Sequence, residues 1–191
     1  MELPVVDGRS LEGEAVLEVA KLMCIAARTA PKSGGIDDVL TAVVTGEEKN
    51  RLAEEMEKLY EETGHKGFLR DARNVRDSEV VVLIGVRGAK HFEFEVNCGA
   101  CGFAGCSAFE QVEKKRRARD FIGPNCMFKL LDLGIAIGSA VKTASIHNVD
   151  NRVMYRIGAA AVRLNYLPEA SVVMGIPLSA KGKSIYFDRK M

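Results

Sequence analysis

Apolar side chains recur with helical spacing along much of the chain. In residues 14–27 the polar positions form one narrow stripe, and in 47–63 the apolar positions form one face that ends at Gly64. Shorter or more apolar patterns predict further helices over 68–75 and 127–145. The last helix is expected to start from a cap at Asp150 or Asn151. Its inward positions are expected to be Met154, Ile157, Gly158, Ala161 and Leu164.

Strand patterns alternate with these helices. Residues 39–44 form a short β-branched run, and 80–86 are almost wholly apolar, which predicts a central strand buried on both faces. Residues 91–96 alternate between apolar and acidic side chains, and 171–174 predict a last strand that Pro177 ends. The order predicts an α+β (or mixed α/β) domain with helices packed on a sheet of about four or five strands.

Composition adds few constraints to this picture. The 191 residues carry 28% charged and 47% hydrophobic side chains, as expected for one globular domain over 1–191. A net charge of +1 gives no reason to expect nucleic acid or a membrane surface as a partner. The best apolar run, 130–141, is interrupted by Asp132 and is too short to span a bilayer. With no signal peptide, a cytoplasmic location is expected.

Four of the five cysteines gather in one segment with the spacing C-x2-C-x4-C-x19-C: Cys98, Cys101, Cys106 and Cys126. Thiolate is the soft, anionic ligand that iron takes in a [4Fe–4S] cluster. Gly99, Gly102 and Gly105 let the loop wrap tightly, and the turn at Pro124 aims the last cysteine back at the others. The spacing predicts a metal centre in an inserted segment over 91–127.

Other uses of these cysteines remain open. Zinc is the strongest rival because four thiolates make a closed tetrahedral site. Disulfides fit less well with an odd number of cysteines and no signal peptide. A thioredoxin-type pair at Cys98 and Cys101 leaves the other two unexplained. Cys24, in the first apolar helix, is expected to be a buried core residue.

A helix is predicted to begin directly after the third cysteine. Ser107 and Glu110 have the spacing of a capping box, and the helix dipole at this end favours a negative cluster. Basic residues follow on the same predicted helix, and they are interpreted as a solvated face or as a docking patch for an acidic redox partner protein. These are Lys114, Lys115, Arg116, Arg117 and Arg119.

Small residues and histidines complete the candidates. Within 127–145, small side chains at Gly134, Gly138, Ala140 and Ala144 predict one thin side for close packing in the core or between two copies of the chain. The histidines, His65, His91 and His147, are scattered and are interpreted as surface or helix-end residues. No general acid–base pair is evident.

The cysteine loop resembles a known iron–sulfur domain. The run N-C-G-A-C-G-F-A-G-C-S-A-F is similar to the small domain of electron-transport and corrinoid-linked complexes, which implies a [4Fe–4S] cluster on the four cysteines. In that family prolines often follow the last cysteine, whereas here Pro124 precedes Cys126.

The rest of the chain resembles the nitroreductase fold, a flavin-binding α+β homodimer with a mixed sheet flanked by helices. The similar segments are 26–35, with the sequence A-A-R-T-A-P-K-S-G-G, then 38–53, and 133–177. The combination of both resemblances is similar to a family of uncharacterised prokaryotic proteins with a ferredoxin-type domain.

The nitroreductase resemblance also implies an FMN site. Its candidate residues are Arg9, Ser10, Arg28, Pro31, Ser33 and Arg189. A second arginine of the opening motif and the asparagine after the proline–serine turn are missing. Three functions are therefore carried forward: an iron–sulfur electron-transfer protein or redox-enzyme component, an FMN-dependent reductase with its own cluster, and a zinc-stabilised module without redox chemistry.

Overall fold

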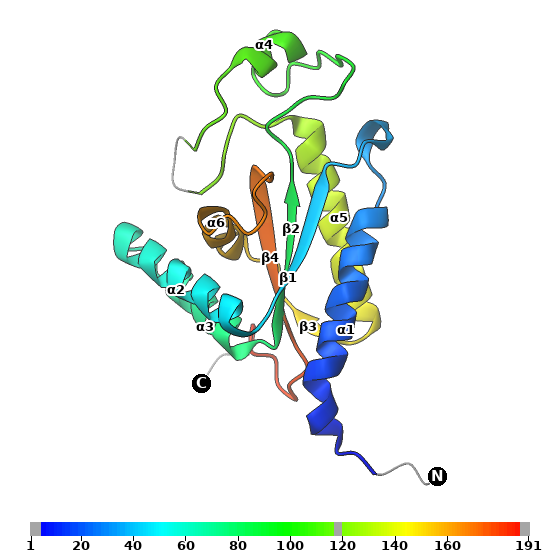
Figure 1. Cartoon of the computed structure of the whole chain (residues 1–191), viewed down its shortest axis with the longest axis vertical. Helices are drawn as coiled ribbons and strands as arrows, with labels where there is room; N and C mark the ends of the chain where they lie inside the picture. The colour runs from blue at the N-terminus through cyan, green and yellow to red at the C-terminus, as the bar shows by residue number, and fades with distance from the viewer. Residues whose placement is uncertain (1–4, 117–119, 188–191) are drawn as a thin grey trace.

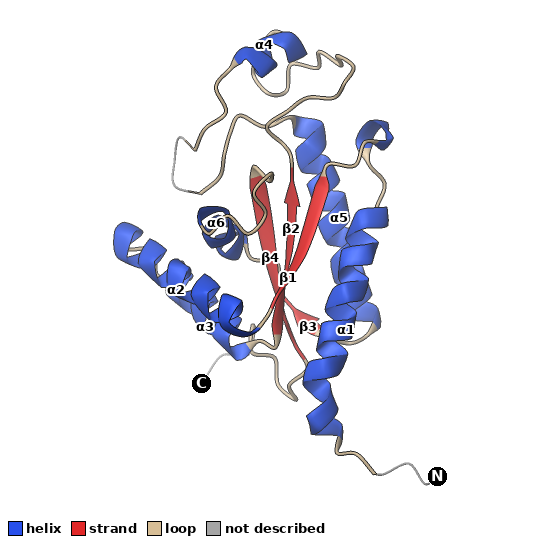
Figure 2. Ribbon diagram, viewed as in Figure 1, coloured by secondary structure: helices blue, strands red, loops and turns tan. Residues whose placement is uncertain are grey.

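The computed structural model describes residues 5–116 and 120–187, and it forms a sheet between two layers of helices (Figures 1 and 2). The helices are α1 (Gly8–Thr29), α2 (Gly46–Thr63), α3 (Gly67–Asp77), α4 (Cys106–Gln111), α5 (Met127–Ile146) and α6 (Tyr155–Arg163), with a 3-10 turn η1 (Ser33–Gly35). The strands are β1 (Val39–Val44), β2 (Val80–Val86), β3 (Asp150–Asn151) and β4 (Val172–Ser179).

The sheet has the strand order β1-β2-β4-β3, and each neighbouring pair is antiparallel. On the central strand, Leu83 lies opposite Ala42 of β1 and Gly175 of β4. The expected α+β class is confirmed. The sheet was expected to be mixed, but within the described residues no parallel pair is present. Between β1 and β2 the chain passes through two helices, α2 and α3, rather than the single crossover helix that usually joins parallel strands.

The two faces of β2 are covered by different helices. Val82 and Ile84 pack in one core with α1 and α5, whereas Val81 and Leu83 pack in the other with α2, α3 and α6. Since successive side chains of a strand point to opposite faces, a strand buried on both faces must be apolar throughout. The predicted central strand is confirmed, with every residue of β2 buried.

Helix α5 does not have the single thin side that its small residues predict. Ala140 and Ala144 are buried against α1 and the sheet, but Gly134 and Gly138 are exposed on the outer side of the helix. At 100° per residue the two pairs of positions fall on different faces. The small residues therefore serve two surfaces, one in the core and one facing outward.

Three predicted boundaries are wrong. Residues 91–96 form no strand, because no strand pairs with them and Phe92 instead stacks on Phe94 at 5.2 Å between ring centroids. Strand β4 runs through Pro177 to Ser179, with β2 still paired opposite it. Helix α6 begins after Met154, because Asp150 and Asn151 are used as strand β3.

The cysteine segment lies at one end of the sheet. It leaves the end of β2, carries α4, and returns at the start of α5 (Figure 1). The two ends of the segment are therefore fixed by β2 and α5, which both belong to the core. Its status as an insertion over 91–127 within a single domain stays a prediction.

Candidate functional site

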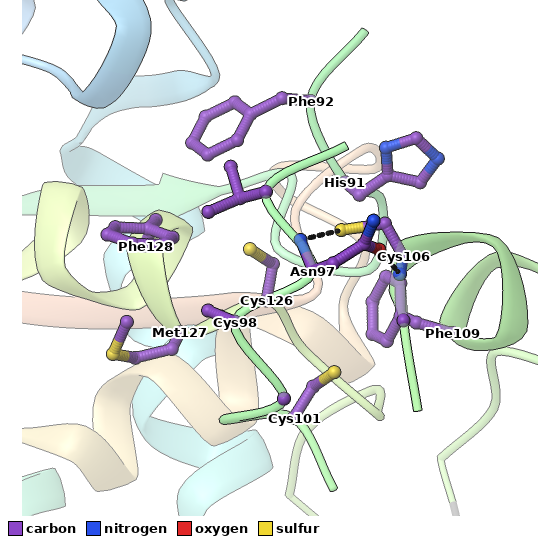
Figure 3. A pocket seen from close by; sticks show the side chains of 13 residues that line it. His91, Phe92, Asn97, Cys98, Cys101, Cys106, Phe109, Cys126, Met127 and Phe128 are labelled. Atoms are coloured by element: carbon purple, nitrogen blue, oxygen red, sulfur yellow. Dashed lines mark hydrogen bonds between the residues drawn. The ribbon is translucent and has the colours of Figure 1, made fainter. Parts of the chain in front are cut away.

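All four predicted cysteine ligands line one cavity at this end of the sheet (Figure 3). Cys98 is exposed, and Cys101, Cys106 and Cys126 are half-buried. The space between them is small, with a cavity volume of about 20 Å³. Tertiary structure therefore brings the distant Cys126 to the three cysteines of the loop.

Left-handed backbone at three positions coils the loop. Asn97, Gly99 and Gly102 have φ of 50°, 72° and 85°, a region that glycine enters without steric cost. The Gly102 N–H donates to the Gly99 carbonyl at 2.9 Å and closes the turn between the first two cysteines. Gly105 is extended instead, and it is small because a Cβ there would lie 2.7 Å from Asn97 Oδ1.

Asn97 and Cys106 exchange two hydrogen bonds across the loop. The Cys106 N–H donates to Asn97 Oδ1 at 2.7 Å, and the Asn97 N–H donates to Cys106 Sγ at 3.4 Å (Figure 3). Hydrogen bonds from peptide N–H groups to cysteine sulfurs orient and tune the ligands of iron–sulfur sites. The loop thus supplies an electrostatic partner to one of its own candidate ligands.

Cys126 is held to the sheet through its backbone. Its N–H donates to the Gly88 carbonyl at 2.8 Å, directly after β2. The neighbouring Asn125 places Oδ1 2.6 Å from Ser171 Oγ, which also accepts the Gly88 N–H at 2.9 Å. A side chain at Gly88 would clash with Asn125 and Ser171, so glycine is required for this close approach.

The helix after the third cysteine differs from its prediction. It ends at Gln111, and Ser107 donates to Glu95 rather than forming a capping box with Glu110. That contact and a hydrogen bond from Asn97 lower the pKa of the Glu95 carboxyl. At the end of this helix Lys114 donates to the carbonyls of Phe109 and Val112, so its ammonium is engaged by backbone oxygens. Arg117 and Arg119 lie outside the described residues.

The cavity wall contains residues that sequence reasoning missed. Phe92, Phe109, Met127 and Phe128 line it, and so does His91, which was interpreted as a surface residue. Nδ1 of His91 is buried and has no hydrogen-bond partner in the described part of the chain. The position of His91 just upstream of the cysteines is the signal that could have indicated this.

A buried ion-pair cluster behind this wall was also missed. Lys129 of α5 is fully buried and binds Asp38, whose other oxygen lies 2.7 Å from Lys90. Burial raises the pKa of Asp38, but hydrogen bonds and charge from Lys129 and Lys90 outweigh it and lower the pKa below its usual range. An isolated lysine in the otherwise apolar start of α5 was the available sequence signal.

The predicted FMN residues do not converge within one chain. Arg9 and Ser10 begin α1, whereas Arg28 is near its other end, about 30 Å away at 1.5 Å per residue. Arg28 binds Asp37 at 2.8 Å, and the Ser33 hydroxyl and N–H both bind Asp132 Oδ1. Pro31 is exposed between these two residues, and Arg189 lies outside the described residues.

Cys24 has a structural role, and the described residues show neither a single-ion metal site nor a membrane-spanning helix. Cys24 is half-buried against the core of α1 and α5, and burial raises the pKa of its thiol. In residues 5–116 and 120–187 no three histidine, cysteine or acidic side chains converge on a point that could hold a single metal ion. Among these same residues, no helix is both long and apolar enough to cross a membrane.

Two comparisons of the sequence with known proteins give matches. A family described as "uncharacterized protein containing a ferredoxin domain" matches residues 122–189, which include Cys126. An uncharacterized protein from Archaeoglobus fulgidus is 48% identical over 181 residues, which cover 95% of this chain and 95% of the relative.

The fold is similar to that of nitroreductases. A nitroreductase with bound FMN from Bacteroides fragilis superposes on 100% of this chain and 84% of its own, with a TM-score of 0.58 and 11% identity. Nitroreductase A from Vibrio parahaemolyticus gives a TM-score of 0.52 over 96% of this chain at 11% identity. This chain spans only 63% of that enzyme, so it is smaller than several neighbours of the same fold.

Proposed function

This chain belongs to the family of uncharacterized proteins that contain a ferredoxin domain, and on that premise we propose that it is an iron–sulfur protein that carries electrons. Cys98, Cys101, Cys106 and Cys126 would hold a [4Fe–4S] cluster. Such a cluster, when bound, accepts and releases one electron at a time. The rest of the chain would fix the ligands and set the environment of the cluster.

One observation carries the proposal: the four cysteines line the same cavity, although Cys126 is far from the others in sequence. A closed loop and a separately anchored fourth thiol are what four corners of one cubane require. Five apolar side chains, Phe92, Val96, Phe109, Met127 and Phe128, also line the cavity and cover part of the ligand environment. The four cysteines fit the iron–sulfur cluster that the ferredoxin domain in the family description implies.

The spacing of the cysteines favours a cluster over a single zinc ion. Structural zinc sites often use two short C-x2-C pairs. Here only Cys98 and Cys101 have that spacing, whereas Cys106 and Cys126 have no cysteine partner so near in sequence.

The test is the metal content of protein purified without oxygen. The parent chain is expected to be brown and to contain the four irons and four acid-labile sulfides of one cluster. Cys126→Ala is expected to lose the cluster or retain a three-iron form. Cys24→Ala is the matched control, and it should keep the parent content because Cys24 lies in the α1 core.

The outcomes separate the alternatives. A colourless protein that contains zinc would contradict the electron-transfer proposal and support the zinc-stabilised module. A parent level of iron and sulfide in the Cys126 variant would remove this residue from the ligand set. Loss of iron in the Cys24 variant as well would indicate unfolding rather than ligand loss.

The nitroreductase-like fold supports an oxidoreductase role, and one neighbour of this fold binds FMN. Because Arg9 and Ser10 are remote from Arg28, Pro31 and Ser33 within one chain, a flavin site built from them would need a second copy of the chain. Acid denaturation of the same preparation reports on flavin. A yellow supernatant would favour the FMN-dependent reductase, and a colourless one would exclude bound flavin.

Two partners complete the proposal. A second copy of the chain would cover the exposed apolar side chains on α1 and α5. An acidic redox protein would meet the basic stretch after α4, where Arg116 is exposed and Lys115 lies 2.6 Å from Glu113.

A further inference from the structure

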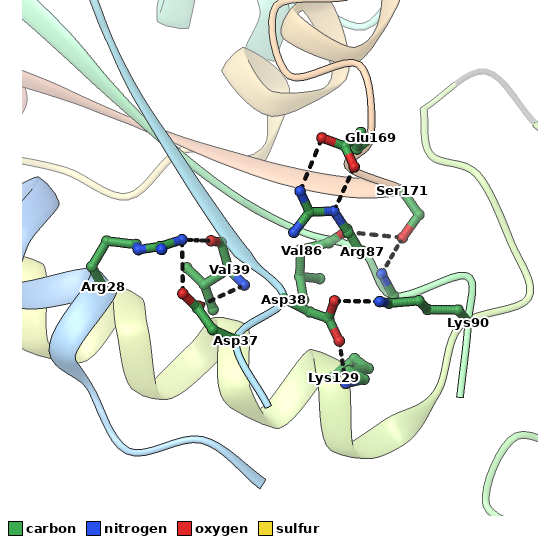
Figure 4. Close-up of polar contacts among 11 residues, drawn as sticks. Arg28, Asp37, Asp38, Val39, Val86, Arg87, Lys90, Lys129, Glu169 and Ser171 are labelled. Carbon is green, nitrogen blue, oxygen red and sulfur yellow. Dashed lines mark hydrogen bonds and ion pairs between the residues drawn. The ribbon is translucent and has the colours of Figure 1, made fainter. Parts of the chain in front are cut away.

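Lys129 is a cation in the interior of the protein. Its side chain is 0% exposed, and it is bound by Asp38, which is 3% exposed (Figure 4). The second oxygen of Asp38 lies 2.7 Å from Lys90, whose side chain is 48% exposed. Two lysines therefore share one carboxylate, and the cluster of the three side chains carries a net charge of +1.

This charge lies behind the wall of the cysteine cavity. The Lys129 ammonium is 4.0 Å from the centroid of the Phe92 ring, and that ring is 6.0 Å from the ring of Phe128. Both phenylalanines line the cavity, and Lys129 follows Cys126 by one turn of the chain. Phe92 thus contacts the buried ammonium and also lines the cavity of the four thiols.

Stability alone does not explain this arrangement. Removing two charges from water costs about as much as their attraction returns, so an apolar side chain at position 129 would serve the core equally well. Asp38 also has a charged partner in Lys90 without Lys129. Under the proposed function, the excess positive charge would be matched by a cluster whose four thiolate ligands are anionic.

We propose that the Lys129 ammonium, oriented by Asp38, is a positioning residue that raises the reduction potential of the cluster; this inference rests on the proposed iron–sulfur function. One-electron reduction adds one negative charge to the cluster and its four thiolates. A buried positive charge nearby stabilises the reduced form more than the oxidised form. Lys129 and Phe92 are both buried, so the interaction is weakly screened on this side of the cavity.

The expected size follows from Coulomb's law. For charges on the order of 10 Å apart at an effective dielectric constant of about 20, one unit charge changes the reduction equilibrium by about tenfold. For a one-electron couple, a tenfold change corresponds to about 59 mV. An effect of this size is readily measured by redox titration.

The experiment is an anaerobic titration with dithionite as the electron donor, followed by absorption and electron paramagnetic resonance. Lys129→Met is expected to lower the potential by about 59 mV, and Asp38→Asn to raise it by a similar amount. The double variant restores the parent net charge and should return to within threefold of the parent equilibrium. Lys90→Met, at a half-exposed position, should lower the potential by less than Lys129→Met.

Iron and sulfide content is measured first in every protein. A parent chain without a cluster would overturn both the proposed function and this inference. Parent-like clusters whose potentials do not change, or change in the same direction in Lys129→Met and Asp38→Asn, would overturn this inference alone. Because a purely structural role would not give shifts of opposite sign that cancel in the double variant, the cycle separates charge from packing.

Discussion

At the scale of single residues, the site depends on a few polar contacts at its base. Asn97 and Cys106 bind each other twice, and Gly105 leaves room for the Asn97 side chain. The Cys126 backbone is tied to Gly88 after β2. Spacing alone indicated the four cysteines, but it could not indicate these contacts, because each depends on a residue brought close by the folded loop.

Asp38 gives a pH-dependent prediction. Its pKa is lowered in the folded state, so its charge stabilises the fold fully above the unfolded pKa of about 3.9, and this contribution is lost as the pH falls through the lower folded value. Asp38→Asn leaves Lys129 buried without its counter-ion and is expected to lower the free energy of unfolding by about 3 kcal/mol at pH 7.

Urea unfolding of the parent and the Asp38→Asn variant across pH 2–7 measures this effect. The difference in unfolding free energy should be constant above about pH 5 and shrink below about pH 4, where the carboxyl takes up a proton. A difference that stays the same at the lowest pH would show that the loss comes from packing and not from charge.

At the scale of elements, α6 packs unusually close to β4. A Cβ added at Gly158 would lie 1.6 Å from the Val173 carbonyl oxygen, and one at Gly175 would lie 2.1 Å from the Ile157 side chain. The sequence indicated both the helix and the strand. Their close contact could not be predicted, because it depends on a glycine of each element lying against a residue of the other element.

Gly158→Ala tests this contact. The added methyl group must push helix and strand backbones apart, so the variant is expected to lose about 3 kcal/mol of unfolding free energy or not to fold. Gly13→Ala is the control in α1, where an added Cβ has nothing within 4 Å. It should gain about 0.5–1 kcal/mol from helix propensity, as measured by thermal or urea unfolding. Equal stability of both variants would contradict the close approach.

At the scale of the whole molecule, α1 and α5 form an outer layer with exposed apolar side chains. Leu22 and Ile25 on α1 are 42% and 60% exposed, and Leu131 and Ile135 on α5 are 52% and 45% exposed. These positions are spaced by three or four residues, so each pair shares a helix face. Such a face is typical of an isologous interface between two copies of a chain.

Ile135→Asp is therefore expected to convert a homodimer into a monomer, because it would place a charge in the interface. Light scattering coupled to gel filtration measures the mass. Val153→Asp is the control, since Val153 is 42% exposed in the segment between β3 and α6 and not on this layer. A monomeric parent chain, or a dimer that persists in the Ile135 variant, would contradict this interface.

The sequence by itself determined the elements with strong periodicity and the set of four cysteines. The apolar strand β2 and the amphipathic helix α2 follow from local patterns of apolar side chains, which any compact fold must bury. The metal-binding chemistry of the cysteines follows from their residue type alone. The same local information indicated the family.

The tertiary structure alone decided which of the predicted segments pair with a strand and which charged side chains meet a counter-ion. Residues 91–96 alternate as a strand would, but no strand of the described residues pairs with them, and His91, Phe92 and Val96 line the cavity instead. Lysine is a residue type that is usually exposed, yet Lys129 is buried. Asp38, from a distant segment of the chain, offsets the cost of burying its charge. Contacts of this kind cannot be predicted from local sequence. The free energy of burying a side chain depends on the neighbours that only the folded chain brings to it.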